Sequence, residues 1–233
     1  MVLLNIKKDK ITIVIFSLIA ILLILPVIAY YLESSKTGFF YAYGDSITRA
    51  TGIDDLNPDG SDDYVVQMVK LFLPTLSVAQ NMDGGGMTSS WGVENLSKHY
   101  NKNIKYFVYM FTNDGWFQLP DNTTIENYLL IYNYVKGNDT IPVPCIPILN
   151  RRPSEPEYSW ESQDRRFKAL ESALDAKKIK YVKMYDALDS KPFNDRLDAI
   201  NTTYLPDGIH PNKTGQTMMA QYLWKELVQQ HFF

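Results

Sequence analysis

The sequence is poor in the residues on which several kinds of protein site depend. Cys145 is its single cysteine, so the chain forms no internal disulfide and no zinc site built from several cysteines. Cys145 lies in the apolar run 141–149, where a small buried core residue is expected. The net charge of −3 gives no excess of basic residues. Because nucleic-acid-binding surfaces are clustered and basic, we expect no nucleic-acid partner.

What remains is the composition of a globular protein, with 45% hydrophobic and 21% charged residues. Short apolar runs, typical of strands, occur at 39–43, 75–79, 104–110, 141–149 and 181–184. Segments with helical spacing separate or follow them at 62–73, 89–100, 124–135, 161–176 and 213–230. Such alternation predicts a single α/β domain in which helices cover a mostly parallel sheet.

Residues 11–31 form the one long hydrophobic run and contain no charged side chain. At about 1.5 Å per residue, a helix of this length spans a bilayer core of about 30 Å. We therefore expect a transmembrane helix that anchors the protein. A cleaved signal peptide is the alternative, although the run is longer than most signal-peptide cores and no small-x-small cleavage site is obvious after it.

The charges around this hydrophobic run predict its orientation. Three lysines precede it within residues 1–10, whereas Lys36 alone follows it closely. By the positive-inside rule, residues 1–10 stay in the cytoplasm. After a short linker at 32–38, the domain formed by residues 39–233 then lies outside the membrane. Cleavage of a signal peptide would export the same domain in secreted form.

A serine stands directly after the first predicted strand. Gly44 ends that strand, and its small size permits a tight backbone turn. Ser46 follows within this turn, so its hydroxyl would be held at the edge of the sheet. A serine nucleophile further requires a base that takes its proton and a carboxylate that orients the base.

Asp207 and His210, near the other end of the chain, fit these two roles. They are three residues apart, so a short turn can place both side chains on one side. The chain has only three histidines. His99 follows a helix rich in polar residues and His231 lies in the C-terminal tail, which leaves His210 as the plausible base.

Two further segments can stabilise a negatively charged oxygen. Residues 81–86 follow the second predicted strand and end in three glycines, which can offer a backbone N–H without a blocking side chain. Asn113 follows the third strand and can donate from its side-chain amide. Each such donor is typically worth about 3 kcal/mol of barrier. All these segments lie at predicted strand ends, which meet at one edge of a parallel sheet.

These segments together resemble the sequence blocks of the SGNH, or GDSL, hydrolases. Residues 44–48 are similar to the first block, whose serine is the nucleophile and supplies one oxyanion N–H. Residues 81–89 resemble the second block, and its usual spacing places the functional glycine at Gly86. Asn113 and Asp114 match the third block. Asp207, His210 and Pro211 are similar to the last block.

The resemblance covers about residues 39–233 and implies a fold, a site and a mechanism. The fold is a three-layer α/β/α sandwich with a flavodoxin-like, five-stranded parallel sheet. Ser46, His210 and Asp207 are then the catalytic triad. Ser46, Gly86 and Asn113 are the oxyanion hole. The implied reaction is two-step acyl transfer through an acyl-enzyme, without a cofactor.

The resemblance departs from the family pattern at Phe111, which stands where the third block usually has glycine. We expect Phe111, together with Trp91, Trp116 and Asp45, to line the substrate pocket. Core packing is the alternative for the two tryptophans, and a hydrogen-bonding role in the turn is the alternative for Asp45.

The sequence therefore predicts a membrane-anchored, extracytoplasmic serine esterase that deacylates small-molecule or glycan esters, acetylated glycans among them. A lipase or lysophospholipase that acts on lipid esters is one alternative, and a catalytically silent glycan-binding module is another. Residues 55–63 begin like a calcium loop, but Val66 stands at the twelfth position. We therefore expect a solvated acidic loop and no metal. The sequence predicts no particular oligomeric state.

Overall fold

The computed structural model describes residues 39–50, 61–74, 76, 78–80, 85–101, 103–149, 160–188 and 203–233. The hydrophobic segment 11–31 lies outside these described residues, so the predicted anchor or signal peptide stays a prediction. Outside them too are most of the acidic segment 55–63 and residues 81–84 of the glycine-rich segment. Within the described part of the chain, no helix is both long enough and apolar enough to cross a membrane.

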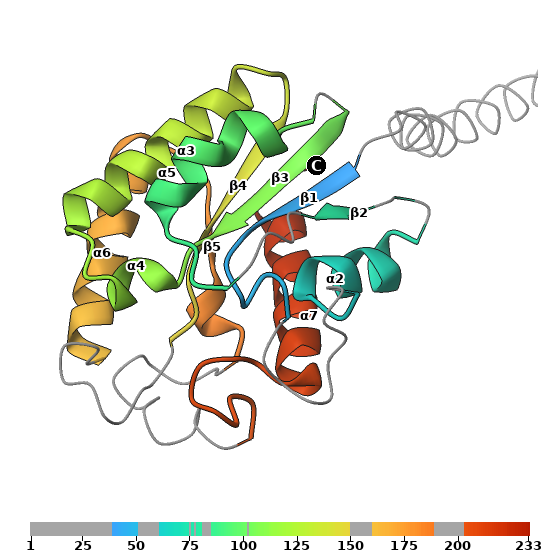
Figure 1. Cartoon of the computed structure of the whole chain (residues 1–233). Helices are drawn as coiled ribbons and strands as arrows, with labels where there is room; N and C mark the ends of the chain where they lie inside the picture. The colour runs from blue at the N-terminus through green and yellow to red at the C-terminus, as the bar shows by residue number, and fades with distance from the viewer. Residues whose placement is uncertain are drawn as a thin grey trace, which may run out of the picture. The chain divides into compact units, whose positions relative to one another are not determined.

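A parallel sheet forms the centre of the domain (Figure 1). Its strands are β1 (Phe39–Gly44), β2 (Val78–Gln80), β3 (Ile104–Met110), β4 (Ile141–Ile146) and β5 (Val182–Lys183). They lie in the order β2-β1-β3-β4-β5, and every neighbouring pair is parallel. The predicted α/β fold with a parallel sheet is confirmed.

Helices cover both faces of this sheet (Figure 1). One face carries α2 (Tyr64–Phe72) and α7 (Lys213–Gln229). The other carries α3 (Ser89–His99), α5 (Asp121–Lys136) and α6 (Trp160–Ala176). The short helices α4 (Asn113–Trp116) and η2 (Met184–Asp186) follow β3 and β5. Because all strands run the same way, the loops after β1, β2 and β3 gather at one edge.

Aromatic side chains fill much of the core around β1 and β3. Phe40 stacks on Tyr106 with ring centroids 4.5 Å apart, and Tyr41 stacks on Phe107 at 5.2 Å. The hydroxyl of Tyr43, a fully buried residue, donates to the Gly92 carbonyl at 2.7 Å. Burial of a hydroxyl costs free energy unless it is hydrogen-bonded. This contact therefore lets a tyrosine fill a position deep in the sheet.

Phe111 packs into this core, and its expected role as a substrate-pocket residue stays a prediction. Its side chain is 1% exposed and makes edge-on ring contacts with Tyr43 and Tyr128. A Cβ atom at Gly92 would lie 2.4 Å from the Phe111 ring. The ring thus occupies space that a glycine on α3 leaves free. The Phe111 N–H donates to the Tyr128 hydroxyl at 3.1 Å, and that hydroxyl donates to the Cys145 carbonyl.

This complementarity predicts that Gly92 and Phe111 are energetically coupled. We expect Gly92→Ala to destabilise the fold by about 1–3 kcal/mol through overpacking, despite the better helix propensity of alanine. Phe111→Leu should cost about 1 kcal/mol or more by itself. In the double variant the smaller leucine relieves the overpacking, so the combined cost falls below the sum. Urea denaturation of the four proteins measures this coupling, and strictly additive costs would contradict it.

Candidate active site

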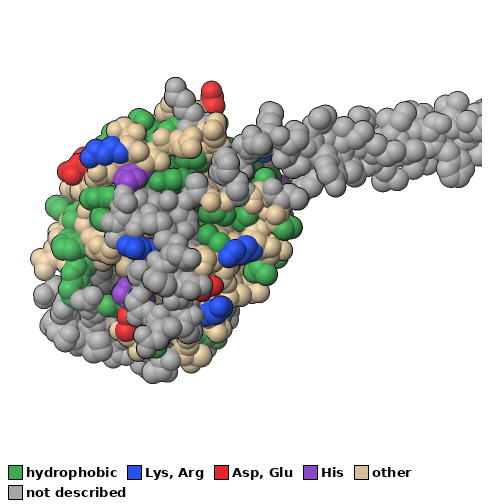
Figure 2. All heavy atoms as spheres, turned by 45° about the vertical axis from the view of Figure 1, so that its right-hand side comes forward, with side chains coloured by type: hydrophobic (Ala, Val, Ile, Leu, Met, Phe, Trp, Pro, Cys, Tyr) green, Lys and Arg blue, Asp and Glu red, His purple; other side chains and the backbone are tan. Residues whose placement is uncertain are grey.

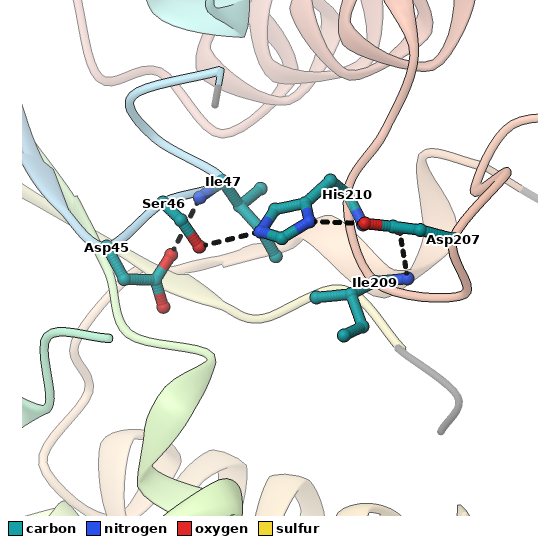
Figure 3. Close-up of polar contacts among 6 residues, drawn as sticks. All are labelled: Asp45, Ser46, Ile47, Asp207, Ile209 and His210. Atoms are coloured by element: carbon teal, nitrogen blue, oxygen red, sulfur yellow. Dashed lines mark hydrogen bonds and ion pairs between the residues drawn. The ribbon is translucent and has the colours of Figure 1, made fainter. Parts of the chain in front are cut away.

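The end of β1 delivers Ser46 to the edge of the sheet. The strand ends at Gly44, where an added Cβ would lie 2.3 Å from both the Met110 carbonyl oxygen and the Thr48 hydroxyl. No side chain fits at that position, which explains the glycine. Ser46 is 8% exposed, and its Oγ lies 3.0 Å from Nε2 of His210 (Figure 3).

The turn before α7 holds His210 against Ser46. Oδ1 of Asp207 accepts hydrogen bonds from the backbone N–H groups of Ile209 and His210, at 2.8 and 2.7 Å. Its Oδ2 lies 2.6 Å from Nδ1 of His210 (Figure 3). Gly208 has φ +81°, a left-handed conformation that favours glycine. One carboxyl group thus closes the turn and orients the imidazole ring.

The charge of Asp207 determines which imidazole nitrogen carries the proton. Partial burial raises the pKa of this carboxyl. Hydrogen bonds from the His210 ring, the His210 N–H and the Ile209 N–H outweigh that effect, so the pKa lies below its ordinary value. An ionised carboxylate only accepts, so Nδ1 of neutral His210 must donate to it. Nε2 is then free to accept the proton of the Ser46 hydroxyl.

Gln216 connects the turn that carries Ser46 with α7, the helix that follows His210. It was not among the site residues predicted from the sequence. It is fully buried on α7, where Nε2 donates to the Ile47 carbonyl at 3.1 Å and Oε1 accepts from the Tyr64 N–H at 3.0 Å. The serine turn, α2 and α7 are thereby tied together. A signal was present, because Gln216 precedes Met219 and Leu223 at helical spacing and so lies on the apolar face.

Asp45 is a structural residue, and its prediction as a pocket residue is wrong. The side chain is 1% exposed. Oδ1 accepts from the Ile47 N–H, while Oδ2 accepts from the hydroxyl and N–H of Thr112 and from the N–H of Asn113. Burial raises the pKa of the Asp45 carboxyl, and these hydrogen bonds oppose the rise. Asp45 therefore joins the turn that carries Ser46 to the turn that carries Asn113.

The candidate oxyanion donors lie around Ser46. A Cβ atom at Gly85 would be 3.7 Å from the Ser46 Cβ, so the glycine segment passes close to the serine. Gly86 next to it is exposed and has φ +78°. Asn113 donates from Nδ2 to the Met87 carbonyl at 3.3 Å. Since Nδ2 carries two hydrogens, one N–H remains for a substrate oxygen.

Aromatic residues near the site differ in their placement. Trp91 is half-buried and packs on Tyr43 and His99 at 5.8 and 5.7 Å, which favours the core-packing alternative, and its pocket role stays a prediction. Trp116, in α4, is half-buried and stays a prediction. Phe117 was not predicted, yet it is 54% exposed, and a Cβ at Gly86 would lie 3.9 Å from its ring.

Comparisons with known proteins agree with this arrangement. Residues 40–223 match the family model of GDSL-like lipase/acylhydrolases. A putative lipolytic protein of the G-D-S-L family from Desulfitobacterium hafniense has a similar structure, with a TM-score of 0.65 and 14% identity. That match covers 81% of this chain and 98% of the other. The acetylxylan esterase Axe2 from Geobacillus stearothermophilus has a TM-score of 0.62 and 16% identity, with 82% and 96% covered.

No curated protein sequence matches the chain. At these identities the solved structures show a common fold, whereas the family model covers most of the chain and includes Ser46, Asn113, Asp207 and His210. The family match also agrees with the contact between Ser46 and His210 at 3.0 Å. The chain therefore belongs to the GDSL-like lipase/acylhydrolase family and is a serine hydrolase of ester bonds.

Proposed function

We propose that this protein hydrolyses short acyl esters through Ser46, His210 and Asp207. The observation that carries the proposal is the continuous contact from Ser46 Oγ to His210 Nε2, at 3.0 Å, and from His210 Nδ1 to Asp207 Oδ2, at 2.6 Å. A hydroxyl, a base and an orienting carboxylate in this arrangement are what nucleophilic acyl transfer requires.

The reaction then proceeds in two acyl transfers. His210 Nε2 takes the hydroxyl proton as Ser46 Oγ bonds to the carbonyl carbon, and the carbonyl electron pair moves onto oxygen. The N–H groups of Ser46 and Gly86 and the Asn113 amide stabilise that charge. The intermediate collapses, the alcohol leaves with the proton from His210, and an acyl-enzyme remains. Water, deprotonated by His210, attacks it and releases the acid and free Ser46.

We further propose that the substrate is an acylated glycan. The name of the similar acetylxylan esterase Axe2 supports this substrate class, as does the exposed ring of Phe117 beside Gly86, since aromatic faces suit sugar rings. The catalytically silent binding module had one support in the sequence, Phe111. The contact between Ser46 Oγ and His210 Nε2 at 3.0 Å favours the esterase over this module.

The proposed location is the outer surface of a membrane. Residues 11–31 would form the anchor, with residues 1–10 in the cytoplasm and the catalytic domain outside. The length of the uncharged hydrophobic run and the lysines before it support this orientation. Secretion after cleavage of a signal peptide is the second candidate for the location.

A panel of p-nitrophenyl esters tests the proposed acyl preference. We expect the full chain in mild detergent to have a kcat/KM for the acetate at least about tenfold above that for the decanoate. A short acyl pocket cannot bury eight further methylenes, each worth about 0.8 kcal/mol in a lipase. A preference for decanoate would instead favour the lipase alternative, and no turnover of either ester would favour the silent module.

A further inference from the structure

Exposed hydrophobic side chains gather at one end of the domain. The described residues include seven large hydrophobic side chains with high exposure, and four of these are Leu71, Phe72, Val228 and Phe233. Leu71 and Phe72 end α2, while Val228 lies in the last turn of α7. With the half-buried Trp224, they form what we call the end patch: Leu71, Phe72, Trp224, Val228 and Phe233.

Ring contacts make the end patch continuous and tie it to the sheet. Phe72 stacks on Trp224 at 5.1 Å with an interplanar angle of 3°. Trp224 contacts Phe233 at 5.3 Å, and Phe233 contacts the edge of Tyr106 at 5.4 Å. Tyr106 stacks on Phe40, the second residue of β1. The end patch therefore lies beside the starts of β1 and β3.

The active site lies at the opposite end of the same strands. Ser46 lies two residues after the end of β1, whereas the end patch adjoins the first residues of that strand. A strand of six residues is about 20 Å long. If the end patch lay on a surface, Ser46 would therefore be roughly 20 Å from that surface.

The chemistry of the end patch suits a lipid–water interface. Tryptophan and other aromatic rings are enriched at that depth of a bilayer, and nearby lysines can extend to the headgroups. Lys105 lies 5.4 Å from the Tyr106 ring, and Lys180 lies 5.7 Å from the Phe232 ring. Figure 2 shows hydrophobic side chains exposed beside lysine and arginine side chains on the face that comes forward there.

The connection between the domain and the hydrophobic segment 11–31 is a reason to expect lipid against the end patch. The chain enters the domain at Phe39, at the same end as the end patch. Between segment 11–31 and Phe39 lies the linker 32–38, which spans at most about 25 Å when extended. The covalent link therefore limits how far Phe39 can lie from segment 11–31.

We propose that the end patch rests on the surface of the membrane that holds residues 11–31, so that Ser46 faces away from the lipid. This inference rests on the anchor put forward as part of the proposed function. It also deepens that function, because a lipid ester in the same leaflet cannot reach a serine held roughly 20 Å above it. The substrate must approach from the side away from the membrane, as a glycan ester would.

Quenching of single tryptophans by brominated lipid tests this orientation. The full chain is placed in phosphatidylcholine–phosphatidylglycerol vesicles whose lipids are brominated near the headgroup. One variant keeps only Trp224, and a matched variant keeps only Trp116 at the active-site end, with phenylalanine at the other tryptophans. We expect the Trp224-only protein to lose about half of its fluorescence or more, because interfacial side chains lie about 5–10 Å into the headgroup region. The Trp116-only protein should keep its fluorescence.

Two further substitutions show whether the end patch causes the quenching. Phe72→Ser with Phe233→Ser should restore most of the Trp224 fluorescence, while Leu130→Ser, at an exposed position on α5 outside the end patch, should not. Equal quenching of Trp224 and Trp116, or an unquenched Trp224 in chains that float with the vesicles, would overturn the orientation. An unquenched Trp224 in chains that float is the result expected if a second copy of the protein covered the end patch. Chains that do not float would refute the anchor and the orientation together, and p-nitrophenyl acetate turnover tests the esterase separately.

Discussion

Ser46→Ala and His210→Ala should each lower the kcat of the full chain for p-nitrophenyl acetate by at least about 10³-fold. The Ser46 Oγ lies 3.0 Å from His210 Nε2, within hydrogen-bonding distance. Removal of either partner ends the same proton transfer. The double variant should therefore be no slower than the single variants, because residues that act as a unit are not additive.

Matched controls separate this loss from unfolding. Ser97→Ala replaces an exposed serine on α3, and His231→Asn replaces an exposed histidine after α7. Both should keep kcat within about twofold of the parent, since surface substitutions change stability by less than about 0.5 kcal/mol. If folded Ser46→Ala or His210→Ala retained a tenth of the parental kcat, another nucleophile or base would have to be sought.

Gly44→Ala should have the largest effect on stability of any single methyl group added near the site. A Cβ at this position would lie 2.3 Å from the backbone carbonyl oxygen of Met110 and from the Thr48 hydroxyl. Gly44 pairs with Met110 in the central strands β1 and β3, so the carbonyl cannot move without breaking the sheet register. Overpacking usually costs 1–3 kcal/mol, and here we expect at least about 3 kcal/mol.

Gly85→Ala is the matched control for this prediction. Among the residues that the structure describes, an added Cβ at Gly85 would contact only the Ser46 Cβ, at an ordinary 3.7 Å. Its free energy of unfolding should stay within about 0.5 kcal/mol of the parent. Urea denaturation followed by circular dichroism measures both variants. A Gly44→Ala protein as stable as Gly85→Ala would mean that the turn at the end of β1 is not packed as described.

The central strands could be predicted from the sequence because their physical signal is local. Apolar runs predicted strands at 39–43 and 104–110, and the structure has Phe39–Gly44 and Ile104–Met110. A strand buried on both faces is a continuous apolar run that ends at turn residues. The edge strand β2 was predicted at 75–79 but spans Val78–Gln80, because a short edge strand carries a weaker pattern.

Side-chain orientation was harder to predict, because it depends on contacts that are distant in the sequence. Ser46, Asp207 and His210 come together as the motif predicted. The packing of Phe111 could not be predicted, because it depends on the space that Gly92 leaves on another element. Gln216 was missed because its partners, Ile47 and Tyr64, are distant in the chain. Local patterns identify a chemical group but not its neighbours.

The most direct test of the central claim is the site of a fluorophosphonate adduct. An activated serine attacks such a probe at phosphorus, and peptide mapping by mass spectrometry then locates the modified residue. We predict one adduct per chain, on Ser46, with none in Ser46→Ala and much slower labelling in His210→Ala. A folded parent protein that takes up no probe, or takes it up at another residue, would contradict Ser46 as the nucleophile.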